Sequence, residues 1–168
     1  MSRRYFIETF GCQMNVHDSE RMAGLLDRDG YEPTLSADEA DLIIVNTCSV
    51  RERAEEKLYH RLAEIRHLGG GGEGRPVVAV TGCVAQQEGE AILSRDPIVD
   101  VVVGTQSAKR LPVLIDEVIR ERMPIVDVDL HEDVSFPLGV ARRADPVKAY
   151  ITIIEGCNDF CAFCVVPY

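Results

Sequence analysis

The sequence predicts an α/β domain whose open, mostly parallel sheet carries helices on both faces. Short β-rich apolar runs alternate with longer segments of helical periodicity, which favours parallel strands joined by right-handed crossovers. The run Leu42-Ile43-Ile44-Val45 is continuously apolar, as is typical of a strand buried on both faces. With 168 residues, 46% of them hydrophobic, the chain is long enough for one domain with a substantial core.

The first elements follow from local patterns. Residues 5–10 alternate and are rich in β-formers, so they predict a strand, and residues 11–15 predict a turn. Residues 18–28 have helical periodicity, with Gly30 as the stop. After the strand at 42–45, Ser49-Val50-Arg51-Glu52 has the form of a capping box and predicts a helix that runs to about His67.

The later elements continue the alternation after a glycine-rich surface connection at residues 69–74. Pro112 falls in the first turns of the helix predicted at 107–122, where proline is tolerated. The predicted strands are 77–80, 99–103 and 125–128, and the predicted helices are 86–94 and 107–122. Together these elements predict a flavodoxin-like or Rossmann-like sheet.

The last forty residues differ in composition from the rest. Residues 129–146 hold several acidic residues and two prolines with little periodicity, which predicts a linker. A β-branched run at 150–154 then predicts a further strand outside the first sheet. We therefore expect a domain at 1–128, a linker at 129–146 and the start of a second domain at 147–168.

A tight group of cysteines closes the chain. Cys157, Cys161 and Cys164 have the spacing Cys-x3-Cys-x2-Cys, which suits three corners of a cubane iron–sulfur cluster with the fourth iron open. A structural zinc site usually completes its shell with a fourth Cys or His, and none follows Cys164. Phe163 is a candidate to pack against the adenine of a nucleotide bound to the open iron, or to fill a core.

A second group of cysteines is dispersed along the chain. Cys12, Cys48 and Cys83 each follow an apolar strand and precede a helix. Because the carboxyl ends of parallel strands share one edge of a sheet, we expect the three thiols to meet there, near helix N-termini that lower thiol pKa values. Gly11 and Gly82 are expected to let the backbone approach a bulky ligand. This pattern predicts a second three-cysteine cluster, with zinc or three buried structural thiols as the alternatives.

Bulk properties limit the classes of function. The formal net charge of −10 disfavours this stretch as the main source of any nucleic-acid affinity. No signal-peptide segment or bilayer-spanning run occurs in the sequence, and six cysteines without a secretory signal favour ligands over disulfides. We therefore expect a cytoplasmic protein that binds no membrane, as a monomer.

Both cysteine groups, with Thr9-Phe10-Gly11-Cys12, Asn46-Thr47-Cys48 and Thr81-Gly82-Cys83, resemble the radical S-adenosylmethionine methylthiotransferases. Within that family, Gln13-Met14 and the residues after Cys164 are similar to the branch that modifies N6-isopentenyladenosine in tRNA. The family typically has a partial α/β barrel after its first domain, so the resemblance makes 147–168 the first strand and cluster loop of a truncated radical SAM barrel.

The resemblance implies a division of labour between the two cysteine groups. Cys12, Cys48 and Cys83 would hold an auxiliary [4Fe–4S] cluster that carries or activates sulfur. Cys157, Cys161 and Cys164 would hold a [4Fe–4S] cluster that binds S-adenosylmethionine. Reductive cleavage of S-adenosylmethionine, with electrons from a flavodoxin-type or ferredoxin-type donor, would lead to methylthiolation of C2 of the adenosine beside the tRNA anticodon.

The chain lacks the remaining barrel and the tRNA-binding domain of that family. We therefore expect an N-terminal fragment that is inactive by itself and binds tRNA weakly or not at all, and no residue is assigned as catalytic. The alternatives are a non-catalytic iron–sulfur or zinc module, a flavodoxin-like nucleotide binder, or a methylthiotransferase that acts on another tRNA adenosine or on a ribosomal protein.

Overall fold

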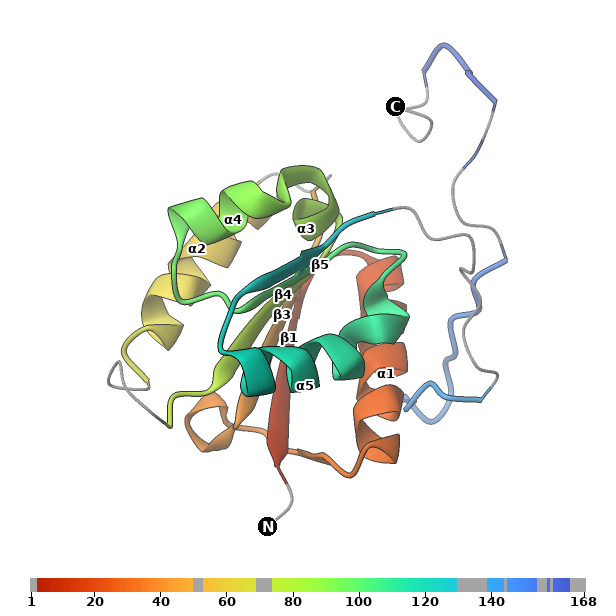
Figure 1. Ribbon diagram of the computed structural model, residues 1–168. Helices are drawn as coiled ribbons and strands as arrows, with labels where there is room; N and C mark the ends of the chain where they lie inside the picture. Colours follow the sequence, from red (N-terminus) through yellow and green to blue (C-terminus); the bar gives the residue numbers. More distant parts are fainter. Residues whose placement is uncertain are drawn as a thin grey trace.

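A computed structural model describes most of the chain. The described residues are 3–49, 53–68, 74–129, 139–143, 145–153, 157 and 159–163. Their arrangement is a central sheet between two layers of helices (Figure 1).

The sheet has six parallel strands, which confirms the predicted fold class. Its strands lie in the order β2-β1-β3-β4-β5-β6, so the longest and most apolar strands are central. The strands are β1 Arg4–Phe10, β2 Glu32–Pro33, β3 Leu42–Thr47, β4 Val77–Gly82, β5 Val101–Val103 and β6 Ile125–Asp127. β2 was not predicted, because a two-residue edge strand with both residues exposed carries no alternating pattern.

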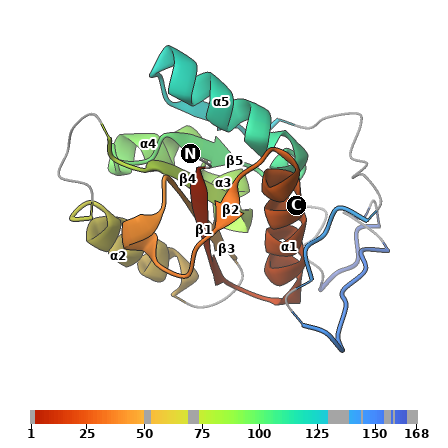
Figure 2. The same cartoon turned by 90° about the horizontal axis from the view of Figure 1, so that it is seen from below.

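One face of the sheet is covered by α1 (Gln13–Arg28) and α5 (Leu111–Glu121). Their apolar sides meet alternate residues of the strands, so Leu26 and Ile115 pack in one cluster with Ile44 of β3. Pro112 lies in the first turn of α5, as predicted. Figure 2 shows these two helices on the same side of the sheet.

The opposite face is covered by α2 (Ala54–Ile65), α3 (Cys83–Glu88) and α4 (Glu90–Arg95). Leu58 and Leu62 of α2 and Ile92 of α4 are fully buried against Ile43 of β3 and its neighbours. Both faces of the sheet are therefore buried, which explains the continuous apolar runs at the start of the central strands β3 and β4.

Several helix boundaries differ from the prediction. α1 begins at Gln13, inside the predicted turn, and α2 begins at Ala54, beyond the predicted capping box. Arg53 precedes α2 in a left-handed conformation, and residues 50–52 lie outside the described part of the chain. The helix predicted at 86–94 is instead two short helices, because Gly89 takes φ +50° between them.

Part of the predicted linker lies against α1. The Arg142 backbone N–H donates a hydrogen bond to the Glu20 carbonyl oxygen (2.8 Å), and Val140 is buried. Gly24 makes this close approach possible, since a Cβ atom there would lie 1.5 Å from the Val140 carbonyl oxygen. We call residues 139–143 the strap, and Figure 1 shows the chain in this region running beside α1.

The strand predicted at 150–154 is not formed in its described residues, 150–153. Ile151 and Ile153 are 76% and 93% exposed. A parallel strand requires a hydrogen-bonded neighbour, and no strand among the described residues pairs with this segment.

None of the helices in the described ranges combines the length and the apolar character needed to cross a bilayer.

Candidate metal centre at the sheet edge

Cys12, Cys48 and Cys83 lie at the carboxyl ends of three adjacent strands, β1, β3 and β4. The last residues of these strands, Phe10, Thr47 and Gly82, are partners in one register, so the three chains end level with one another. The Cys48 backbone N–H also donates to the Phe10 carbonyl oxygen (2.9 Å). The sheet topology thus brings three thiols that are distant in sequence to one edge, the carboxyl-end edge where open α/β sheets bind their ligands.

The three cysteines relate differently to the following helices. Cys12 is the N-cap of α1 and Cys83 is the first residue of α3. Between Cys48 and Ala54, where α2 starts, there are five residues. Cys48 is therefore neither the cap nor the first residue of a helix, but the Thr47 hydroxyl before it donates to the Ala54 carbonyl oxygen (3.5 Å), so the start of α2 lies close to this turn.

Burial raises the pKa of the Cys83 thiol above its ordinary value. The neighbouring Cys48 and Cys12 raise this pKa further, because each thiolate disfavours a second negative charge nearby, and a backbone hydrogen bond from Ser49 lowers it. The pKa of Cys83 is thus raised, opposite to the lowering expected at a helix N-terminus.

The glycines beside these cysteines make room for protein side chains. A Cβ atom on Gly11 would lie 2.1 Å from Asn15 Oδ1, and one on Gly82 would lie 2.4 Å from Asn46 Oδ1. Gly82 also has φ +93°, which favours glycine. In the structure these glycines allow close packing against two buried asparagines, and the expected approach of a bulky ligand stays a prediction.

Sequence reasoning missed the functional interest of Asn15 and Asn46. Both are buried, and their amide groups bond to each other behind the cysteine-bearing turns (3.1 Å). The available signal was Asn46 itself, a polar residue that continues the apolar strand Leu42–Thr47 on the face covered by α1. A buried amide in such a strand requires a partner, and the partner comes from α1.

The terminal group is described only in part. Cys157 and Cys161 are exposed, and the Asp159 backbone N–H donates to Cys157 Sγ (3.4 Å). Cys164 lies outside the described residues. Phe163 is 95% exposed, so in this structure it fills no core.

The donor set at the sheet edge is three thiols, a kind of ligand that both iron–sulfur clusters and zinc accept. Among the described residues, no three His, Cys, Asp or Glu side chains form a group that could hold one metal ion. In a cubane each thiolate binds a different iron, so the ligands stand farther apart than around one ion. Three thiols on adjacent strand ends, with no fourth ligand required, fit that arrangement.

The sequence matches a known family over most of this domain. The family described as "Uncharacterized protein family UPF0004" matches residues 4–104, which run from the start of β1 to the end of β5 and contain the three strand-end cysteines.

Curated relatives match the whole chain. A protein of Rickettsia conorii named tRNA-2-methylthio-N(6)-dimethylallyladenosine synthase is 47% identical over 173 aligned residues, covering 100% of this chain and 39% of the relative. Proteins of the same name from Rickettsia bellii and Acidovorax sp. are each 46% identical, with 39% and 37% of their lengths covered. The chain therefore spans about two fifths of the length of the curated relatives it matches.

Proposed function

The chain belongs to the family described as UPF0004, and from that premise we propose that it is the N-terminal part of a tRNA methylthiotransferase. The intact parent would add a methylthio group to C2 of N6-isopentenyladenosine next to the tRNA anticodon by radical SAM chemistry. The names of the relatives support this substrate, and their 46–47% identity extends through both cysteine groups.

The observation that carries the proposal is the placement of Cys12, Cys48 and Cys83 at three neighbouring strand ends. These residues would hold an auxiliary [4Fe–4S] cluster, and Cys157, Cys161 and Cys164 would hold the [4Fe–4S] cluster that binds S-adenosylmethionine. When bound, the clusters supply one-electron chemistry and an open iron for sulfur or S-adenosylmethionine. The buried sheet below the strand-end cysteines would exclude water from one side of the site.

The proposal includes a division of the chain and a set of partners. Residues 1–128 would form the methylthiotransferase domain, 129–146 the connection and 147–168 the start of the radical SAM domain, with Phe163 against bound nucleotide. The parent would take tRNA as substrate and a flavodoxin-type or ferredoxin-type protein as electron donor. Because tRNA is the substrate, the proposal places the protein in the cytoplasm, and we expect it to be monomeric.

Anaerobic reconstitution with iron and sulfide tests the cluster assignment. We compare the unmutated chain with two triple Cys→Ala variants, one for each cysteine group. We expect about four tightly bound irons with matching sulfide at the sheet edge, and most of this iron should be lost only when Cys12, Cys48 and Cys83 are replaced. The terminal group should hold iron weakly, since its two described cysteines are exposed.

Two outcomes would contradict this assignment. Equal loss of tightly bound iron from both triple variants would show that the sheet edge is not the principal site. One zinc per chain without sulfide would favour the alternative of a zinc module.

The substrate assignment is tested in the intact parent. Replacing the buried Cys48 by Ala should abolish 2-methylthio-N6-isopentenyladenosine in cellular tRNA and leave N6-isopentenyladenosine in its place, as measured by mass spectrometry of nucleosides. Unchanged methylthiolation of this nucleoside, with loss of a methylthio group elsewhere in tRNA or on a ribosomal protein, would assign another substrate.

A further inference from the structure

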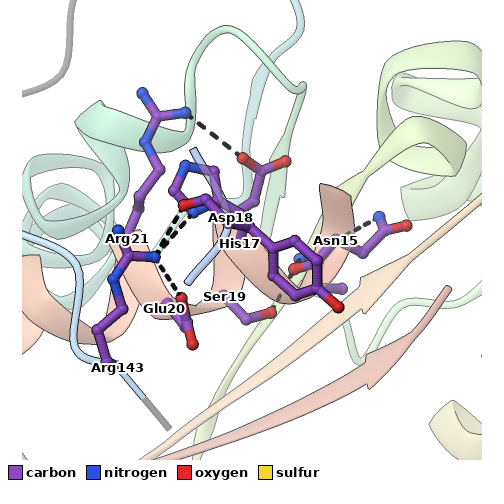
Figure 3. A network of polar contacts seen from close by, with 9 residues as sticks. Asn15, His17, Asp18, Ser19, Glu20, Arg21 and Arg143 are labelled. Atoms are coloured by element: carbon purple, nitrogen blue, oxygen red, sulfur yellow. Dashed lines mark hydrogen bonds and ion pairs between the residues drawn. The ribbon is translucent and has the colours of Figure 1, made fainter. Parts of the chain in front are cut away.

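Two buried asparagine side chains connect the three turns that carry the strand-end cysteines. Asn15 and Asn46 are 1% and 0% exposed. Asn15 Nδ2 donates to Asn46 Oδ1 (3.1 Å), while Asn46 Nδ2 donates to the Asn15 carbonyl oxygen (2.8 Å) and to Ser19 Oγ (2.9 Å). Figure 3 shows Asn15 and Ser19 on successive turns of α1. Each amide therefore both donates and accepts, so the pair is fixed in both orientation and distance.

The pair contacts the surroundings of each cysteine. Asn15 Oδ1 accepts hydrogen bonds from the Cys12 backbone N–H (3.1 Å) and from Cys12 Sγ (3.5 Å). Asn46 precedes Cys48 by two residues on β3. On the third turn, a Cβ atom at Gly82 would lie 2.4 Å from Asn46 Oδ1 and 3.1 Å from Asn15 Nδ2, so the backbone before Cys83 packs directly on the pair.

We propose that Asn15 and Asn46 are a positioning pair that sets the mutual distances of the Cys12, Cys48 and Cys83 thiols. The link to a cluster rests on the proposed function, but the fixing of the thiols does not. A neutral amide pair is suited to this place, because two carboxylates would add negative charge beside thiolates and could not donate to each other. An apolar pair would fill the space without holding the three turns in register.

The test uses the metal-free chain with Cys157, Cys161 and Cys164 replaced by Ala, so that only the sheet-edge thiols remain. Dibromobimane bridges two thiols that lie close together, and monobromobimane measures the reactivity of single thiols. We expect Asn15→Asp to reduce the ratio of bridging to single alkylation by about tenfold, the effect of losing a buried hydrogen bond. The matched control, Val16→Ala, changes a 38% exposed neighbour on α1 and should leave the ratio unchanged.

Asn15→Asp separates positioning from helix capping. The new carboxylate can still accept from the Cys12 N–H and suits the first turn of a helix, so a capping role alone predicts no loss of bridging. It cannot donate to Asn46 Oδ1, so the positioning role predicts the loss. Circular dichroism at the assay temperature verifies that the variant is folded.

An unchanged bridging ratio in folded Asn15→Asp overturns the proposal, as does an equal loss in Val16→Ala. If Asn15→Asp does not fold, Ser19→Ala replaces it, since that variant removes one acceptor of Asn46 Nδ2; a smaller loss supports the pair and no loss overturns it. Iron uptake is then measured in the same variants. If the unmutated chain takes up no iron, the proposed function fails, while the bridging ratio still decides whether the pair positions the thiols.

Discussion

The hydroxyl group of Tyr5 links the first strand to α1 and to the strap. Tyr5 is 3% exposed and donates a hydrogen bond to Asp27 Oδ1 (2.8 Å), and Arg142 forms an ion pair with the same carboxylate (3.1 Å). Burial raises the pKa of Tyr5 to about 12, with a further increase from Asp27 and a decrease from Arg142. The neutral phenol is therefore the form that the folded protein favours.

This shift predicts a pH dependence of stability. The ordinary pKa of about 10 applies to the unfolded chain, so the contribution of Tyr5 is complete below pH 10 and is lost as the pH rises toward 12. We expect Tyr5→Phe to reduce the free energy of unfolding by roughly 1 kcal/mol at pH 8, because the hydrogen bond to Asp27 is lost. At pH 11 ionisation of Tyr5 in the unfolded chain lowers the free energy of unfolding of the wild type by about 1 kcal/mol. The two proteins should therefore become equally stable.

Urea denaturation of both proteins at pH 8 and pH 11 measures this difference. The variant Tyr31→Phe serves as a control for tyrosine ionisation in general. A stability gap between wild type and Tyr5→Phe that widens at pH 11 would contradict the assigned direction of the pKa.

At the scale of elements, α1 serves two surfaces at once. Its inner side packs on the sheet, and its outer side carries the strap through the Glu20 carbonyl oxygen. Figure 3 shows Arg143 of the strap directed at Glu20 and His17 of α1, with an Arg143–Glu20 ion pair of 2.8 Å. Backbone contact at Gly24 therefore holds the strap, together with ion pairs to Glu20 and Asp27, which precede and follow Gly24 in α1.

Gly24→Ala should release the strap without unfolding α1. Alanine is favoured over glycine within a helix by about 1 kcal/mol, yet its Cβ would overlap the Val140 carbonyl oxygen, which lies 1.5 Å away. The strap must therefore move. We expect trypsin to cleave after Arg142 and Arg143 on the order of tenfold faster, in line with easier local opening.

Mass spectrometry of the early tryptic fragments identifies the cleaved bonds. Val113→Ala, at a 65% exposed position of α5, is the control and should leave the cleavage rate unchanged. Unaltered cleavage at Arg142 and Arg143 in Gly24→Ala would show that the strap does not depend on this contact.

Sequence patterns located the long elements but not their ends. The apolar run of β3 and the periodicity around Met22 and Leu26 specify buried surfaces, which decide element type. Helix starts depend on contacts that a local pattern does not contain. α1 begins early because Asn15 accepts from the Cys12 N–H, whereas α2 begins only at Ala54, after Arg53 in a left-handed conformation, and so not at the predicted capping box.

The position of the candidate site was predictable from the sequence, but its supporting contacts were not. The order of strands and helices placed Cys12, Cys48 and Cys83 on one edge, because that follows from topology alone. The amide pair was not predicted, since it joins side chains 31 residues apart that meet only in the folded domain. The ligand role of all six cysteines, and the role of Phe163, stay predictions.

The whole molecule carries a net charge of −10, and the structure shows how its cations are used. Many arginines lie beside carboxylates, so few of them present unbalanced positive charge. These pairs include Arg4–Glu39, Arg61–Glu8, Arg66–Asp96, Arg75–Asp100 and Arg95–Glu55. A surface of this kind offers little attraction to a phosphate backbone.

We therefore expect this chain to bind tRNA no more tightly than roughly micromolar at physiological salt, within the range of non-specific binding. Fluorescence anisotropy with labelled tRNA at several salt concentrations measures both the affinity and its salt dependence. A dissociation constant well below micromolar with a steep salt slope would contradict the prediction and reveal a basic surface in this part of the protein.

The two cysteine groups also differ in the stage of folding at which their thiols become neighbours. Cys157, Cys161 and Cys164 are neighbours in any conformation of the chain, so they can meet a thiol-seeking reagent together as soon as they are synthesised. The sheet-edge thiols become neighbours only after β3 has paired with both β1 and β4. Before that pairing the three thiols are far apart and react singly. Their joint reaction with one reagent therefore reports when the nascent domain has folded.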